Sequence, residues 1–250
     1  MNDQTANSTR AVRRLSPLFQ RLFWFLVLAI SLATTLPSTA DDFADGKQAF
    51  EAKQYEKAIR LLRPLAEKRD ARAQYLLGYA FFSSKGVHEK QAEYWLRKAV
   101  DQDHTAAFVV LGNLLMHKDR SARRGLPLLE VAVRRGHPGA QVALGAHYLI
   151  GRPGIPVNME ESRRLLLLAA DQKYKGAFLF LSMWYASDHG KKPDYVELLK
   201  WAVIDARIGV GPGIFADTYR SRALKHLNQA QVVEANRRAA AWLKAHGETP

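Results

Sequence analysis

The sequence predicts an all-α protein, an α/α solenoid of repeated helix pairs with a C-terminal capping helix. Two landmarks that recur in phase along the 250 residues predict this fold. The first is a Leu-Gly pair, with spacings of 34, 33 and then 37 residues, and its members begin at Leu77, Leu111, Leu144 and, in weaker form, Leu181. The second is an alanine that follows a large apolar residue by four positions, at Ala99, Ala132, Ala169 and Ala202. Periods of this length are typical of helical-repeat proteins.

The composition excludes several classes of protein. Apolar residues make up 48% of the chain, which is enough for a sizeable core. Cysteine is absent, so there are no disulfides, cysteine-ligated metals or thiol nucleophiles. Lysine and arginine outnumber aspartate and glutamate by 37 to 24, and the formal net charge is +13.

Residues 1–40 have the pattern of an export signal. Four arginines between Arg10 and Arg21 precede the uncharged run 22–36, and the small residues Ser38 and Ala40 suit a signal peptidase. We predict cleavage after Ala40 and a periplasmic mature chain without a membrane span. The alternative is an uncleaved anchor, although the run is shorter than the ~20 residues that cross a bilayer comfortably.

Residues 41–212 are predicted to form the solenoid. Its five helix pairs are expected near residues 43–72, 73–106, 107–139, 140–176 and 177–212. Glycine inside a helix costs up to ~1 kcal/mol against alanine. We expect close approach of the paired helix to offset this cost at three first-helix glycines, Gly78, Gly112 and Gly145, each of which faces a small residue on the second helix.

Residues 213–250 are predicted to form C-terminal capping helices, because the open end of a solenoid must be covered. One helix should extend to about His226. Another should begin after Asn228, with Gln231 completing a capping box. Trp242 and Leu243 are apolar anchors near its end.

The repeat pattern resembles the Sel-like repeat family, which is related to the tetratricopeptide repeats. The unit 140–176 shows it best, with Leu144-Gly145, the loop Gly151-Arg-Pro-Gly154-Ile155, and Leu165 followed by Ala169. The unit 107–139 lacks the glycine loop, and Ser182 replaces glycine in the unit 177–212. The resemblance implies a solenoid and an exported scaffold or regulator of the cell envelope.

Templates for catalysis and metal binding are not matched. The chain has no Ser-x-x-Lys, Gly-x-Ser-x-Gly, phosphate-loop or His-Glu-x-x-His motif. His104 and His137 recur at the repeat spacing, and we interpret them as helix-end residues rather than metal ligands. We therefore predict a protein that is not an enzyme and uses no metal or cofactor.

The first helices of such a solenoid are expected to line its concave face. Positions two before, two after and five after each landmark leucine should face this groove. The predicted partner-binding residues are Tyr75, Tyr79, Phe82, Val109, Asn113, Met116, Val142, Leu149, Leu179 and Met183. An exposed apolar patch of this kind marks a site for a peptide of another envelope protein. The alternative is that a tight superhelix buries these residues.

A basic ridge on the convex side is the second candidate site. It would consist of Arg120, Arg123, Arg124, Arg134, Arg135, Arg163 and Arg164. Its ligand would be an acidic polysaccharide, an anionic lipid or an acidic protein, since nucleic acid is not expected for an exported chain. The alternative is a solvated face whose charges are partly paired with Glu130 and Glu160. The sequence thus predicts a periplasmic peptide-binding scaffold, or alternatively an envelope or exopolysaccharide-associated protein.

Overall fold

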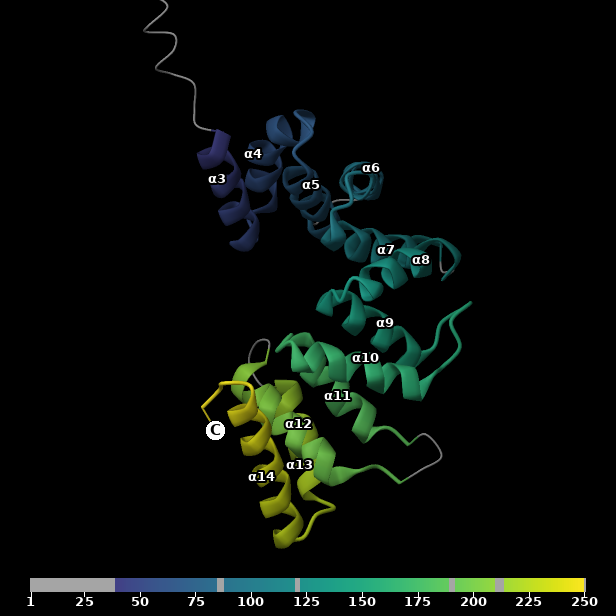
Figure 1. The fold of residues 1–250 in the computed structure, drawn as a ribbon, viewed down its shortest axis with the longest axis vertical. Coiled ribbons are helices and arrows are strands. Elements are labelled where there is room, and N and C mark those ends of the chain that lie inside the picture. The colour runs from purple at the N-terminus through teal and green to yellow at the C-terminus, as the bar shows by residue number, and fades with distance from the viewer. Residues whose placement is uncertain (1–38, 85–87, 120–121, 189–191, 210–213, 250) are drawn as a thin grey trace, which may run out of the picture.

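The computed structural model describes residues 39–249 except 85–87, 120–121, 189–191 and 210–213. These residues form twelve α-helices and no strand, so the all-α prediction is confirmed for them. The helices follow one another in a curved array from α3 to α14 (Figure 1). The predicted signal segment lies outside the described residues apart from Thr39 and Ala40, which begin α3. None of the described helices is long and apolar enough to cross a membrane.

Ten helices form five antiparallel pairs. The pairs are α3 (Thr39–Glu51) with α4 (Tyr55–Glu67), α5 (Ala71–Ser83) with α6 (Glu89–Val100), α7 (Thr105–Asp119) with α8 (Ala122–Arg134), α9 (Pro138–Ile150) with α10 (Met159–Asp171), and α11 (Gly176–Ala186) with α12 (Tyr195–Ile208). Successive first helices also contact one another, whereas successive second helices are not joined by contacts of similar extent in the described residues. The first helices therefore form the shorter, inner layer of the solenoid.

Glycines allow the two helices of a pair to approach closely. A methyl group at Gly78 would lie 2.8 Å from Leu96 Cγ and 3.2 Å from the carbonyl oxygen of Ala92. In the pair α9–α10, the Ser162 hydroxyl donates a hydrogen bond to the Gly145 carbonyl oxygen at 2.8 Å. Helix proximity thus explains why glycine is used inside these helices, as the sequence predicts.

Four second helices end in the same way. The residue after the last turn adopts the left-handed conformation, and these residues are Arg69, Asp103, Gly136 and Lys173, with φ between 56° and 75°. The next N–H then bonds back to the helix, as when His104 N donates to the Ala99 carbonyl at 3.0 Å. This Schellman-type ending turns the chain sharply into the following first helix.

The two C-terminal helices are arranged differently from the pairs. Helix α13 (Ile214–Leu224) packs on α11 and α12, and α14 (Gln229–Ala245) packs along α12 rather than mainly on α13. Its capping box is present, because Asn228 and Gln231 exchange hydrogen bonds at 3.0 Å. Helix α13 thus covers the end of the stack, with Asp217 and Ser221 on its exposed side, and α14 lies over α12.

Candidate functional site

An aromatic cluster lies in the N-terminal half, mainly on the first helices α3 and α5. We define it as Phe50 of α3, Tyr55 at the start of α4, Tyr75, Tyr79 and Phe82 of α5, and His104. The Phe50 and Tyr79 ring centroids are 5.0 Å apart, and Tyr75 stacks on His104 at 4.7 Å. Phe82 is 37% exposed, and Tyr75 and Tyr79 are half-buried. The cluster therefore presents a chain of rings with one side open to solvent.

The cluster continues along the rim where the first helices begin. His104, His137 and Tyr174 occupy equivalent positions, three residues before an alanine that recurs in the repeats. These alanines are Ala107 of α7, Ala140 of α9 and Ala177 of α11. A methyl group at Gly139 would lie 3.1 Å from His137 Cε1 and 3.2 Å from Tyr174 Oη, so these two side chains flank the start of α9. Phe50, Tyr55 and Tyr174 are absent from the sequence prediction. For Tyr174, the repeat register that relates it to the two histidines is the signal that could have found it.

Burial controls the protonation of this surface. Desolvation raises the pKa of Tyr75 to about 12, with smaller contributions from Tyr79 and Tyr174. Desolvation also lowers the pKa of His104 and of His137. At neutral pH the rings are therefore uncharged, which suits an apolar or weakly polar ligand.

The predicted groove is not continuous. Val109, Met116, Val142 and Leu149 are between 3% and 9% exposed, so these four residues belong to the core. The reason is the contact between successive first helices, which covers the middle of the inner face. Asn113, Leu179 and Met183 are partly exposed. The prediction of an open groove is thus wrong at Val109, Met116, Val142 and Leu149. Tyr75, Tyr79 and Phe82, in contrast, do lie together.

The arginines of the predicted basic ridge are largely engaged by neighbouring groups. Arg124 lies 3.1 Å from Glu93, Arg164 lies 2.6 Å from Glu161, and Arg135 pairs with Asp103. Arg163 stacks over the Trp184 ring at 5.6 Å. The remaining members are Arg123 and Arg134, which are exposed, and Arg120, whose side chain lies outside the described residues.

These arginines do not form one compact patch. Arg124 and Arg134 lie at opposite ends of α8, about 15 Å apart at 1.5 Å per residue. In the described part of the chain, no three His, Asp or Glu side chains are grouped so that they could hold a metal ion.

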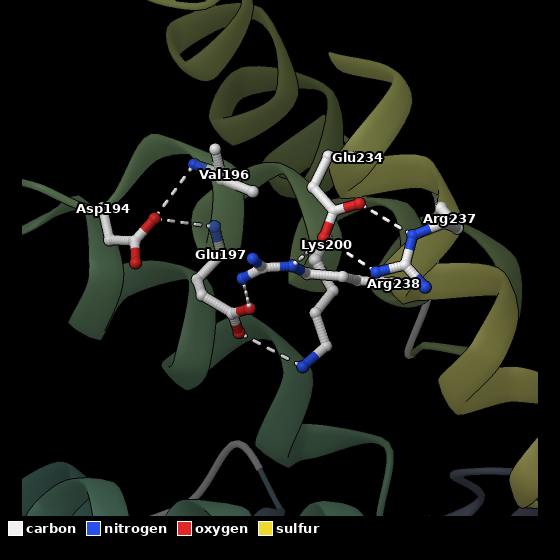
Figure 2. A network of polar contacts seen from close by, with 7 residues as sticks. All are labelled: Asp194, Val196, Glu197, Lys200, Glu234, Arg237 and Arg238. Carbon is white, nitrogen blue, oxygen red and sulfur yellow. Dashed lines mark hydrogen bonds and ion pairs between the residues drawn. The ribbon is translucent and has the colours of Figure 1, made fainter. Parts of the chain in front are cut away.

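A polar network attaches α14 to α12 (Figure 2). Glu197 accepts hydrogen bonds from Lys200 at 3.1 Å and from Arg238 at 2.9 Å. Glu234 binds both Arg237 and Arg238, and these hydrogen bonds lower the pKa of Glu234 to about 2. The arginines of the network are exposed, whereas Glu197 and Lys200 are only partly so, and we assign the network a role in orienting α14.

Comparison with known proteins identifies the repeat. Residues 71–104 and 138–174 match the Sel1 repeat. The chain is 28% identical over 174 residues to the Sel1-repeat-containing protein YjcO of Escherichia coli K12, covering 67% of this chain and 69% of YjcO. The YjcO protein of Shigella flexneri shows the same identity and coverage.

Two solved structures share the fold. One is c5321, a protective antigen of uropathogenic Escherichia coli with an SLR fold, with a TM-score of 0.69 and 21% identity. This match covers 86% of the chain, which spans 48% of the c5321 chain. The other is a Sel1 repeat protein from Oxalobacter formigenes, with a TM-score of 0.55, 18% identity and coverage of 82% and 98%. Proteins that contain the Sel1 repeat are generally scaffolds for protein interactions.

Proposed function

We propose that this chain, a Sel1-repeat protein, is a non-catalytic scaffold or regulator that holds a peptide segment of a partner on its aromatic cluster. The observation that carries the proposal is the chain of rings from Phe50 through Tyr79 and Tyr75 to His104, with Phe82 exposed beside it. Rings of this kind offer large apolar area with polar edges, which is the composition of protein-binding surfaces.

The surface favours a short apolar segment over a long charged one. The rings are neutral at pH 7, and the buried positions of α7 and α9 interrupt the inner face beyond the cluster. A partner would therefore place one or two apolar side chains against Tyr79 and Phe82, and the tyrosine hydroxyls would be available for its backbone.

The proposal includes export to the periplasm. It rests on the arginine-rich start, the apolar run 22–36 and the small residues before Asp41. N-terminal sequencing of the chain recovered from the periplasm of a producing bacterium should begin at Asp41. A chain that retains its first residues in the membrane fraction would instead favour the anchor.

Site-specific photo-crosslinking tests the binding surface. A photoreactive amino acid at position 82 should give a discrete adduct with a partner in the native envelope. The same amino acid at Phe215, which is 63% exposed on α13, is the matched control and should not give that adduct. An adduct that also forms from position 215, or none from position 82, would contradict the proposal.

The alternative function, binding of an acidic polymer or anionic lipid by the basic ridge, has less support. Three of its arginines already bind carboxylates, and two lie at opposite ends of α8. This alternative predicts that retention of the protein on acidic polysaccharide falls steeply between 50 mM and 500 mM salt. The reason is that salt shortens the distance over which charges attract one another to below about 10 Å. Retention that ignores salt would exclude it.

A further inference from the structure

A cleft of about 410 Å³ opens between the end of α4, the start of α5 and α6. Its lining includes Glu67, Arg69, Gln74, Tyr94 and Lys98. Gln74 is held in place, since its Nε2 donates to the Ala66 carbonyl at 2.9 Å and its Oε1 accepts from Gln102 at 2.7 Å. The Tyr94 ring is 53% exposed. The Lys98 ammonium lies 5.6 Å from the centroid of the Tyr94 ring, so the cleft combines a fixed polar wall with a partly exposed aromatic ring next to a cation.

Four charged side chains line this cleft, namely Glu67, Arg69, Lys98 and Asp101. Neither Glu67 nor Arg69 forms an ion pair with another residue of the described chain. Both are exposed, and Arg69 is fixed by the left-handed turn that ends α4. A ligand that carries one positive and one negative group could therefore pair with both.

The repeat register relates this cleft to a second place in the same chain. Alignment of Leu77-Gly78 with Leu181-Ser182, and of Ala99 with Ala202, gives the equivalences. They are Glu67 with Asp171, Arg69 with Lys173, Gln74 with Phe178, Tyr94 with Glu197, and Lys98 with Trp201.

In the C-terminal repeat, α14 occupies that equivalent place. Trp242 packs on Phe178 and Trp201, with ring centroids 5.5 Å and 5.7 Å away. His246 Nε2 lies 3.7 Å from the Asp171 carboxylate, and Lys173 Nζ lies 3.2 Å from Glu248 Oε1. Three residues at the end of α14 and just after it, Trp242, His246 and Glu248, thus contact residues that are equivalent to residues lining the cleft.

The two intervening repeats do not keep this arrangement. Between α6 and α8, Arg135 lies over the Phe108 ring at 4.8 Å and pairs with Asp103, so the chain fills its own groove. Between α8 and α10, Arg134 and Gly136 stand in the places of Asp171 and Lys173. Among the described repeats, only the cleft at α4–α6 retains the acid and base that receive the end of α14.

We propose that the α4–α6 cleft docks the C-terminal turn of an amphipathic helix from a partner protein. That helix carries an aromatic residue, a basic residue four positions later and an acidic residue two positions after that, as Trp242, His246 and Glu248 do. By this register the aromatic side chain lies on Gln74 and the stem of Lys98, beside Tyr94, while the base faces Glu67 and the acid faces Arg69. A second copy is a poorer occupant, because its α14 is held intramolecularly at high effective concentration.

A labelled peptide of residues 229–250 is the probe, titrated against the full-length chain by fluorescence anisotropy. We expect saturable binding that Arg69→Glu weakens at least tenfold. Lys68→Glu, an equal charge reversal at an exposed neighbour outside the cleft lining, should change it less than twofold. A peptide with Glu248→Arg should regain affinity for the Arg69→Glu chain, and a peptide with Trp242→Ala should lose affinity for the unaltered chain. Circular dichroism establishes that each variant folds.

Several outcomes would overturn the proposal. Equal weakening by Arg69→Glu and Lys68→Glu would indicate unspecific charge attraction. Binding lost in Trp201→Ala but retained in Arg69→Glu would show that the peptide displaces the chain's own α14. Dimerisation of the chain that depends on Arg69 would assign the cleft to a second copy. Phe82→Glu should leave peptide binding unchanged, so this test is independent of the proposed aromatic site.

Discussion

Trp242 of α14 contacts Trp201 of α12 edge to face, with 5.7 Å between the ring centroids and 67° between the ring planes. Trp201 is 1% exposed and belongs to the core of the C-terminal repeats. The contact lies one turn beyond the ion pair between Glu197 and Arg238, so α12 and α14 run parallel in constant register. Side-chain packing and the ion pair between Glu197 and Arg238 therefore fix the register of α14 along α12.

Trp242→Ala should destabilise the protein by about 2–4 kcal/mol, because it removes a large partly buried ring from two aromatic neighbours. Arg238→Ala is the control on the same helix and should cost at most about 1 kcal/mol, since the Arg238 side chain is exposed. Urea unfolding measures both. Similar losses for the two variants would mean that charge, rather than packing, holds α14.

The sequence predicts the solenoid because its landmarks depend on local packing. The Leu-Gly pair and the later alanine are the points where two helices of a pair touch, and each recurs wherever that contact recurs. The capping box at Asn228 is likewise a local pattern. These features require no knowledge of how distant repeats are placed.

The candidate site is predicted less well because it depends on curvature. The register of α7 and α9 is correct, but how closely successive first helices approach decides whether Val109 and Val142 are surface or core. The path of α14 depends on its packing against Phe178 and Trp201, and Trp201 stands where the other repeats have Lys98, Val131 and Leu168. Neither property is visible in a single repeat.

Gly125→Ala should be strongly destabilising. A methyl group there would lie 2.4 Å from the Gly112 carbonyl oxygen, and a backbone atom cannot move aside as a flexible side chain can. We expect a loss of about 2–3 kcal/mol, net of the gain in helix propensity. Gly145→Ala is the milder counterpart, because its nearest contact is the Leu166 side chain at 3.0 Å. Thermal unfolding should rank the two in this order, and a smaller effect at Gly125 would contradict the close approach of α7 and α8.

Lys53→Gly should stabilise the protein. Lys53 has φ of 58°, in the left-handed region where side chains other than glycine are strained by about 1 kcal/mol. Gly136→Ala makes the reverse change, because Gly136 has φ of 75° with open space around it. Chemical denaturation should show a gain of about 0.5–1 kcal/mol for the first variant and a similar loss for the second. A lower free energy of unfolding for Lys53→Gly would mean that the Lys53 side chain stabilises the protein by more than its left-handed backbone conformation destabilises it.

Asp205→Asn should stabilise the protein at neutral pH and have no such effect in acid. Burial raises the pKa of Asp205 to about 6 from an ordinary value of 3.8, so the folded state holds a proton that the unfolded state releases. Stability is therefore lost as pH rises from about 4 to 6, and the cost is complete above 6. The Asp205 side chain is partly exposed, so solvent screening reduces the cost to about 1 kcal/mol. Unfolding free energies of the two proteins, measured from pH 3.5 to 8, should converge below pH 4 and separate above pH 6. A constant difference across this range would show that Asp205 titrates normally in the folded state.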